Sequence, residues 1–139
     1  MKMVGLDIGD VRIGIAVCDE NEIIASGVEV YTRAGDLDQD VAYIADKVEE
    51  LKGEKVVFGL PINMNGTFGP ACEKVREFAN ALARKNFIEQ DFMDERLTTA
   101  QAERILIQAD VSRKKRRLVV DKMAAQLILQ SYIDRRGRD

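Results

Sequence analysis

The chain has 139 residues, about the size of one ordinary domain, and 46% of them are hydrophobic, which is enough to build a buried core. The charged fraction of 32% and the shortness of the apolar runs exclude a disordered chain and a transmembrane helix. The lack of histidine excludes Ser-His-Asp and Cys-His catalysis and typical zinc sites, and the two distant cysteines favour a reduced, cytoplasmic protein. Any bound metal should therefore be a hard ion on oxygen ligands, Mg²⁺ or Mn²⁺.

The net charge of −3 is distributed unevenly along the chain. Residues 1–70 carry 6 Lys or Arg against 13 Asp or Glu, a net charge of −7, whereas residues 71–139 carry 15 against 11, a net charge of +4. The basic excess is concentrated in five consecutive residues: Arg113, Lys114, Lys115, Arg116 and Arg117. The overall charge argues against nucleic-acid binding, while this local run favours it.

Three strands are predicted first, at residues 2–8, 11–18 and 22–31. Gly9-Asp10 and a turn at Glu20-Asn21 would join them as an antiparallel meander. A helix over 36–52 should follow, with Gly53 as its stop. The fully apolar run at 55–60 is typical of a strand inside a parallel sheet.

The rest of the chain alternates loops, helices and one strand. The segment 61–70 (PINMNGTFGP) predicts a loop, residues 71–85 a helix and residues 87–93 a strand. Thr98-Thr99-Ala100-Gln101 fits a capping box that opens a helix whose apolar face continues to Ala109. A basic loop and a last helix over 118–134 complete the chain.

The order βββαβαβαα defines the expected fold. Strand–helix–strand units require parallel pairing, so we predict a five-stranded mixed sheet, with three antiparallel strands and then two parallel ones. Helices should cover both faces. This is the ribonuclease-H-like arrangement. We expect residues 1–139 to form a single domain of this kind.

Asp121 is the most unusual residue of the last helix. At helical spacing it stacks with Ala124, Ala125, Ile128 and Tyr132, which form the apolar stripe. A buried carboxylate without a partner is costly or becomes protonated, so the position predicts a cation or a metal. Alternatively, Asp121 lies in the first turn of a helix that starts near residue 119 or 120, or it pairs with Arg117 four residues earlier.

Two further acids occupy similar positions near strand ends. Asp7 lies inside the first strand, and the flanking Gly5 and Gly9 should leave room for a ligand to approach. The alternative is an acid at a hairpin end, solvated or paired with Arg12. Asp94-Glu95-Arg96 ends the fifth strand, and because adjacent strand residues face opposite ways, only one acid can point to the Asp7 side. We favour Glu95, although an acid here could simply stabilise a helix dipole.

Together, Asp7, Glu95 and Asp121 predict a two-metal site that holds Mg²⁺ or Mn²⁺ ions and acts on phosphodiesters. The basic run at 113–117 is either a solvated loop or a phosphate-binding patch beside that site. Arg12 and Arg96, next to two of the acids, are further candidates for nucleic-acid contacts. Aromatic residues are sparse (6%), so base stacking is not an obvious device.

Four motifs, in order and over nearly the whole chain, resemble the YqgF family: GLDIGDVRIGIAV (5–17), FGLPINMNGTFG (58–69), DERLTT (94–99) and VDKMAAQLILQSYID (120–134). The resemblance implies a ribonuclease-H-like fold, a cytoplasmic location and an acidic site of Asp7, Glu95 and Asp121. It also implies a nuclease assigned to processing the 5′ end of pre-16S ribosomal RNA in ribosome biogenesis. The segment GDVRIG departs from the family pattern, which more often has Thr or Ser and then Lys before RIG. No phosphate contact is therefore assigned to positions 10 and 11.

Other functions stay open at this point. The family is also described as Holliday-junction-resolvase-like, so a DNA junction is an alternative to structured RNA. A non-catalytic RNA-binding module with the same fold is a further alternative. An ATPase of the actin and sugar-kinase type has a phosphate loop similar to DIGDVRIG, but it needs two such domains. The expected partner is a nucleic acid and not a membrane, for a monomer or a homodimer.

Overall fold

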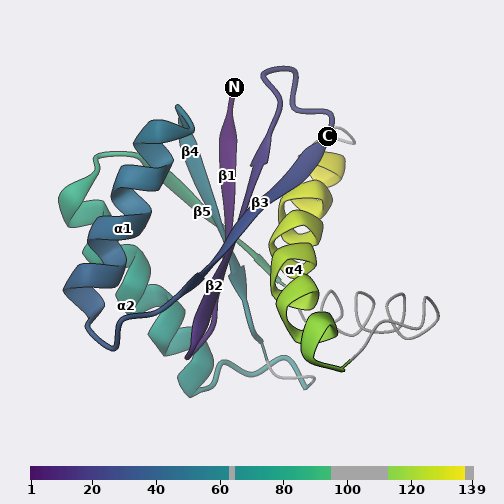
Figure 1. The fold of residues 1–139 in the computed structure, drawn as a ribbon. Helices are drawn as coiled ribbons and strands as arrows, with labels where there is room; N and C mark the ends of the chain where they lie inside the picture. The colour runs from purple at the N-terminus through teal and green to yellow at the C-terminus, as the bar shows by residue number, and fades with distance from the viewer. Residues whose placement is uncertain (63–64, 95–112, 137–139) are drawn as a thin grey trace.

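The computed structural model describes residues 1–62, 65–94 and 113–136, with the backbone alone for 113–122 and 136. These parts of the chain form five strands and three helices (Figure 1). The elements are β1 (Met3–Ile8), β2 (Arg12–Cys18), β3 (Ala25–Thr32), α1 (Leu37–Glu50), β4 (Lys55–Leu60), α2 (Pro70–Lys85), β5 (Glu89–Asp94) and α4 (Arg113–Arg136).

The five strands form one mixed sheet in the order β3-β2-β1-β4-β5. The pairs β1–β2 and β2–β3 are antiparallel, whereas β1–β4 and β4–β5 are parallel. Helices α1 and α2 pack on one face of the sheet, and α4 crosses the other (Figure 1). The predicted ribonuclease-H-like architecture is confirmed.

Alternation along the strands divides the core into two layers. Val4 and Leu6 of β1 pack with α1 and α2, in a cluster that also holds Phe58 and Phe78. Met3 points the other way, into a second cluster made with α4. The α4 residues of that cluster recur at helical spacing and form one stripe: Ala125, Ile128, Leu129, Tyr132 and Ile133. Each face of the sheet is thus covered by an amphipathic helix surface.

The C-terminal half of α4 is fixed to both edges of the sheet. The Gln130 side-chain amide oxygen accepts a hydrogen bond from the Ala25 N–H at the start of β3. At the other edge the Tyr132 hydroxyl donates to an Asp91 carboxylate oxygen of β5, at 2.6 Å. The Lys55 ammonium, from the first residue of β4, lies 3.8 Å from the same carboxylate and 5.0 Å from the Tyr132 ring centre. These contacts hold α4 in one register across five strands.

Two predicted boundaries are wrong at the β2–β3 and α1–β4 connections. Residues 22–24 do not join β3, because the Asp19 carboxylate accepts the N–H groups of Ile23 and Ile24 and Glu22 has a left-handed backbone (φ 56°). Helix α1 ends at Glu50, and Lys52, not Gly53, takes the left-handed position (φ 57°). Gly53 has a different role: a Cβ there would lie 2.7 Å from a Val4 methyl group.

The start of the last helix is also wrong in the sequence prediction. Helix α4 begins at Arg113, so the basic run forms its first turns and is not a loop. Arg, Lys and Leu are good helix formers, and the 24 residues of α4 include neither Gly nor Pro. The predicted helix with the capping box at 98–101 lies outside the described residues.

Candidate functional site

The candidate site lies at the edge of the sheet where β1, β4 and β5 end. These three strands are parallel, so their carboxyl ends meet at one edge. From β1 the sheet extends antiparallel on one side, through β2, and parallel on the other, through β4. In open sheets flanked by helices, ligands bind beyond the carboxyl ends of the strands where the connections diverge in this way. Asp7 is the penultimate residue of β1 and therefore stands at that edge.

Asp7 faces the α4 layer. It pairs with Gly14 of β2, and its side chain is half-buried. Since Leu6 packs with α1 and α2, alternation turns Asp7 to the opposite face, the side of Gly5. The acid is thus held on a central strand, one residue pair away from the β1–β2 turn.

The flanking glycines have a different role from the one predicted. A Cβ on Gly5 would lie 2.8 Å from Leu129 Cβ and 3.1 Å from the Ala125 carbonyl oxygen. A Cβ on Gly9 would lie 2.7 Å from the Arg12 carbonyl oxygen. The space beside these glycines is occupied by α4 and by the hairpin backbone. They permit close packing around Asp7 and do not leave room for a ligand.

The backbone register relates Asp121 to Asp7. Figure 1 shows the C-terminal end of α4 at the same end of the sheet as the chain N-terminus, so α4 runs opposite to β1. Asp121 stands four residues, about one turn, before Ala125, and Asp7 stands two residues after Gly5. Starting from the Gly5–Ala125 contact, both positions lie toward the carboxyl edge. Asp121 is the ninth residue of α4, which excludes the alternative that it lies in a first turn.

The acids at the end of β5 are described only in part. In register, Gly59 of β4 pairs with Met93, and Leu60 pairs with Asp94. Met93 packs against the α4 cluster, whereas Leu60 belongs to the layer of α1 and α2. Asp94 is therefore turned away from the face of Asp7. Glu95 and Arg96 lie outside the described residues.

The predicted basic contacts that the structure describes fall into two groups. Arg12 is the first residue of β2, half-buried and one strand away from Asp7. The run 113–117 occupies the N-terminal end of α4, where the helix dipole is positive and no acid stands in the first turn.

Sequence reasoning missed a buried network that fixes the turn after Asp7. The Arg33 guanidinium donates to the Gly9 carbonyl at 2.9 Å and to the Asp40 carboxylate at 2.8 Å, while the Arg33 backbone N–H donates to the Val11 carbonyl. Asp40 is 1% exposed and also accepts from Tyr31 and from the Ala34 N–H. An acid near a helix start is usually taken for a simple capping residue, so the sequence held no signal for this role.

A second missed contact joins the hairpin to α2. The Lys74 ammonium lies 3.0 Å from an Asp10 carboxylate oxygen, and both side chains are exposed. In the described part of the chain, no three Asp, Glu, Cys or His side chains gather closely enough to hold a metal ion. The predicted metal site therefore depends on Glu95 and Asp121, whose side chains are not in that part.

Comparison with known proteins identifies the family. The RuvX family, described as Holliday junction resolvase, matches residues 1–135. The chain belongs to the RuvX family. It is thus a member of a family of phosphodiester-cleaving hydrolases.

Curated RuvX relatives match over nearly their whole length. A protein of Pelotomaculum thermopropionicum is 46% identical over 138 residues, which cover 99% of this chain and 90% of the relative. A protein of Caldanaerobacter subterraneus subsp. tengcongensis is 49% identical over 135 residues, 96% of each chain. Both are named "Putative pre-16S rRNA nuclease". The predicted resemblance to this family is confirmed.

Solved structures support the fold. Thermus thermophilus RuvC in complex with a Holliday junction superposes with a TM-score of 0.60 at 14% identity and covers 99% of this chain and 96% of that one. The structure of the same RuvC reported without mention of a junction gives a TM-score of 0.57 at 13% identity. In the described residues, no helix has the length and apolar character needed to cross a bilayer.

Proposed function

We propose that this protein is a metal-dependent endonuclease that cuts precursor 16S ribosomal RNA at its 5′ end, in the cytoplasm. Asp7, Glu95 and Asp121 hold one or two Mg²⁺ or Mn²⁺ ions, and the whole chain acts as a single nuclease domain. The proposed substrate rests on the names of the close RuvX relatives. The proposed chemistry rests on the positions of the acids.

One observation carries the proposed site: the contact of Gly5 with Ala125 and Leu129. This contact sets the register in which Asp7 and Asp121 follow on facing elements, toward the same edge. The register of β5 disfavours Asp94, because its partner Leu60 belongs to the layer of α1 and α2 while Met93 packs on the α4 face. We therefore propose Glu95 as the ligand.

The residues fit a hard divalent cation. The proposed ligands are all carboxylates, and oxygen-only sites select Mg²⁺ or Mn²⁺. Asp7 is half-buried on a central strand, at the edge where the carboxyl ends of β1, β4 and β5 meet. A bound divalent ion would polarise the scissile phosphate and lower the pKa of attacking water.

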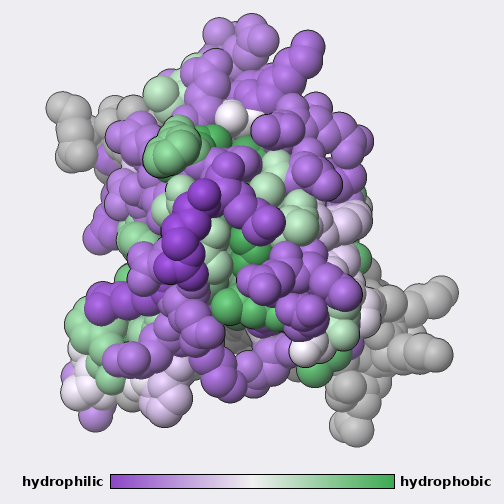
Figure 2. All heavy atoms as spheres, turned by 90° about the vertical axis from the view of Figure 1, so that its left-hand side faces the viewer, coloured by the Kyte–Doolittle hydropathy of each residue, from purple (hydrophilic) through white to green (hydrophobic). Residues whose placement is uncertain are grey.

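The remaining residues of the chain would bind and orient the substrate. Figure 2 shows largely hydrophilic residues over α1 and α2, and the exposed positions of α1 include Asp38, Asp46, Glu49 and Glu50. The exposed surface of α1 is therefore acidic and repels a polyanion. The basic N-terminal turns of α4 lie on the opposite side of the sheet, so we propose that the RNA backbone approaches the acids along α4.

A four-way DNA junction is the second candidate substrate, because the family itself is described as Holliday junction resolvase. The two candidates differ in the assembly that they require. A junction has two-fold symmetry and requires a homodimer, whereas a monomer can make a single cut in a precursor RNA.

The test compares cleavage of the two substrates by the purified protein. Precursor 16S RNA and a four-way junction are incubated side by side with Mg²⁺, with Mn²⁺ and with EDTA. We expect cut RNA with either metal, none with EDTA, and none with Asp7→Asn, Glu95→Gln or Asp121→Asn. Asp46→Asn, on the acidic surface of α1, is the matched control and should cut normally. If only the junction is cut, the substrate is a DNA junction and not RNA. If the three acid variants still cut, the proposed site is refuted.

A further inference from the structure

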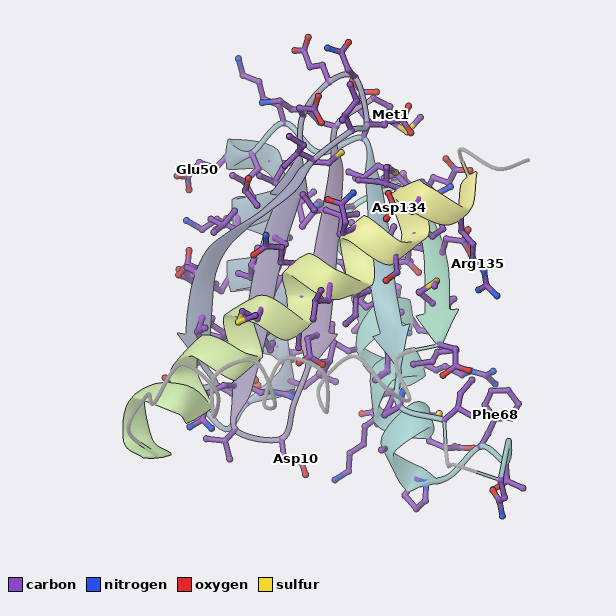
Figure 3. The ribbon with its side chains drawn as sticks, turned by 90° about the vertical axis from the view of Figure 1, so that its right-hand side faces the viewer. Met1, Asp10, Glu50, Phe68, Asp134 and Arg135 are labelled. Atoms are coloured by element: carbon purple, nitrogen blue, oxygen red, sulfur yellow. The ribbon has the colours of Figure 1, made fainter. Side chains whose placement is uncertain are left out.

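An exposed aromatic side chain lies at the carboxyl edge of the sheet. Phe68 stands in the loop that follows β4 and precedes Gly69, the N-cap of α2. Its side chain is 59% exposed. Figure 3 shows Phe68 and Asp10 toward the same end of the sheet, opposite Met1. Asp10 follows Asp7 by three residues, so Phe68 belongs to the edge that carries the proposed site.

One face of the Phe68 ring has a cationic partner. The Arg76 guanidinium carbon, from α2, lies 5.1 Å from the ring centre. A stacked guanidinium shields part of the ring while its N–H groups stay available to an anion. The exposed remainder of the ring is an apolar surface with a cation beside it. A nucleotide has the matching chemistry, since it joins a flat aromatic base to a phosphate.

The residues directly before Phe68 form a turn that is closed by its own hydrogen bonds. The Asn65 side-chain oxygen accepts from the Thr67 N–H at 3.1 Å and from the Thr67 hydroxyl at 2.6 Å. Gly66 has a left-handed backbone (φ 85°), which a glycine adopts without strain. This turn restricts the backbone directly before Phe68, so less conformational entropy is lost when a ligand binds there.

A second contact joins the helix after this loop to the turn that follows Asp7. Lys74, in the first turns of α2, forms its ion pair with Asp10. Helix α2, which follows the loop, and the β1–β2 hairpin are thus bridged by an exposed ion pair. Phe68 and the turn after Asp7 lie toward the same end of the sheet, and one bound strand would run along that edge.

We infer that Phe68 and Arg76 form a stacking site for one unpaired nucleobase next to the phosphodiester that the enzyme cuts. The inference rests on the proposed function for the identity of the cut, but the stacking site itself is a property of binding. It makes the enzyme selective for a strand with an unstacked base at that point. Fully paired duplex offers no base to Phe68, because the aromatic faces of its bases are covered by their neighbours.

The test is a double-mutant cycle in which the Phe68 side chain and the unpaired base are removed singly and together. Affinities are measured in EDTA so that nothing is cut. The probes are RNA hairpins with one unpaired adenine, the same hairpins with an abasic nucleotide in its place, and fully paired hairpins. DNA versions of all three distinguish the two kinds of nucleic acid. The proteins are the wild type, Phe68→Ala, Phe68→Trp and Phe87→Ala. Phe87 is fully exposed (103%) just before β5, at the opposite edge, and is the matched control.

In the wild type, removal of the base should weaken binding by about 5- to 150-fold, the range for one stacked base. Phe68→Ala should show the same loss with the intact base and no further loss with the abasic probe. Phe68→Trp should retain the preference, and Phe87→Ala should behave as the wild type. Arg76→Ala should reduce the preference in part.

Two results would overturn the inference: equal binding of abasic and intact probes by the wild type, or a base preference that survives Phe68→Ala. Absence of measurable binding by the wild type would do the same. Cleavage is scored separately, so the two proposals fail separately. If the protein cleaves with metal but shows no base preference that depends on Phe68, the stacking site alone is refuted. If the base preference depends on Phe68 but no cleavage occurs, the nuclease proposal alone is refuted.

Discussion

Gly5 of β1 lies against Leu129 of α4 so closely that any side chain on Gly5 would meet Leu129 Cβ at 2.8 Å. The close approach fixes the height of α4 above the sheet. It thereby fixes the distance between the β1 backbone at Asp7 and the α4 backbone at Asp121.

The first prediction concerns this contact. Gly5→Ala should lower the free energy of unfolding by roughly 1–3 kcal/mol, because the added methyl group must displace α4 or strain it. Cleavage should fall by more than the loss of folded protein explains, because the helix moves relative to Asp7. Urea unfolding and cleavage rates are compared with those of Ser26→Ala, an exposed change on β3. A variant as stable and as active as the wild type would show that α4 does not depend on this packing.

The second prediction concerns the stability of the proposed acidic site. Clustered carboxylates repel one another when no cation is bound, so Asp121→Asn should melt at the same or a higher temperature than the wild type in EDTA. Mg²⁺ at about a hundred times its Kd should stabilise the wild type by ~2.7 kcal/mol and leave the variant nearly unchanged. Thermal melts with and without Mg²⁺ measure both effects. A large loss of stability in EDTA would instead identify Asp121 as a structural ion-pair partner, for example of Arg117.

The third prediction concerns the basic turns of α4. Replacing Lys114, Lys115 and Arg116 with Ala should weaken binding of all sequences about equally. The slope of log K against log salt should fall by roughly 0.7–0.9 for each lost phosphate contact. Because Ala is the best helix former and the change removes like charges near a positive dipole end, the variant should also be slightly more stable.

The control removes the same charge elsewhere. Lys52, Arg84 and Lys85 are exposed at the ends of α1 and α2, away from the proposed site. Their triple Ala variant should keep the wild-type salt slope. Equal slopes for both triple variants would mean that the RNA does not follow α4.

The fourth prediction concerns the pH dependence of the Arg33–Asp40 network. Burial alone would raise the pKa of Asp40, but hydrogen bonds from the Ala34 N–H, Arg33 and Tyr31 outweigh it and lower the pKa below 3.8. The ionised carboxylate therefore stabilises the fold above pH 3.8, and this contribution disappears as the pH falls through the lowered pKa. Asp40→Ala, which leaves Arg33 buried without its carboxylate, should cost roughly 3–5 kcal/mol near neutral pH.

Urea unfolding at pH values from neutral down to roughly 3 checks this prediction. The gap between the wild type and Asp40→Ala should narrow as the pH falls below 3.8. Asp46→Ala, exposed on the same helix, should differ little from the wild type at any pH. A gap that stays constant down to low pH would mean that Asp40 contributes through packing and not through its charge.

The parts of the fold with strong periodic patterns were predictable from the sequence. Residues 56–60 are apolar because β4 is buried on both faces, and the strand predicted at 55–60 has the observed bounds. The errors occurred where one local interaction overrides the pattern. Ile23 and Ile24 are apolar, but the Asp19 side chain captures their N–H groups, so β3 starts later.

The site was predictable to a smaller extent. The acids are predicted as a site because a carboxylate in a strand or in an apolar stripe contradicts its surroundings, and their convergence stays a prediction. The Arg33 contact with Gly9 was not found, because it joins residues 24 positions apart and leaves no periodic trace. The role of Gly5 was misjudged, since a sequence shows that a glycine leaves space but not which neighbour fills it.

The sheet also separates the two thiols of the chain. Cys18 lies in the cluster beneath α4, Cys72 lies in the cluster of α1 and α2, and both are free and buried. Burial raises the pKa of the Cys18 thiol, so its thiolate forms less readily. Each thiol can react with a soluble alkylating reagent only when its own layer opens. The protein thus contains one natural probe per layer, and the labelling rates of Cys18 and Cys72 would report, without an added dye, whether α4 lifts from the sheet before α2 does.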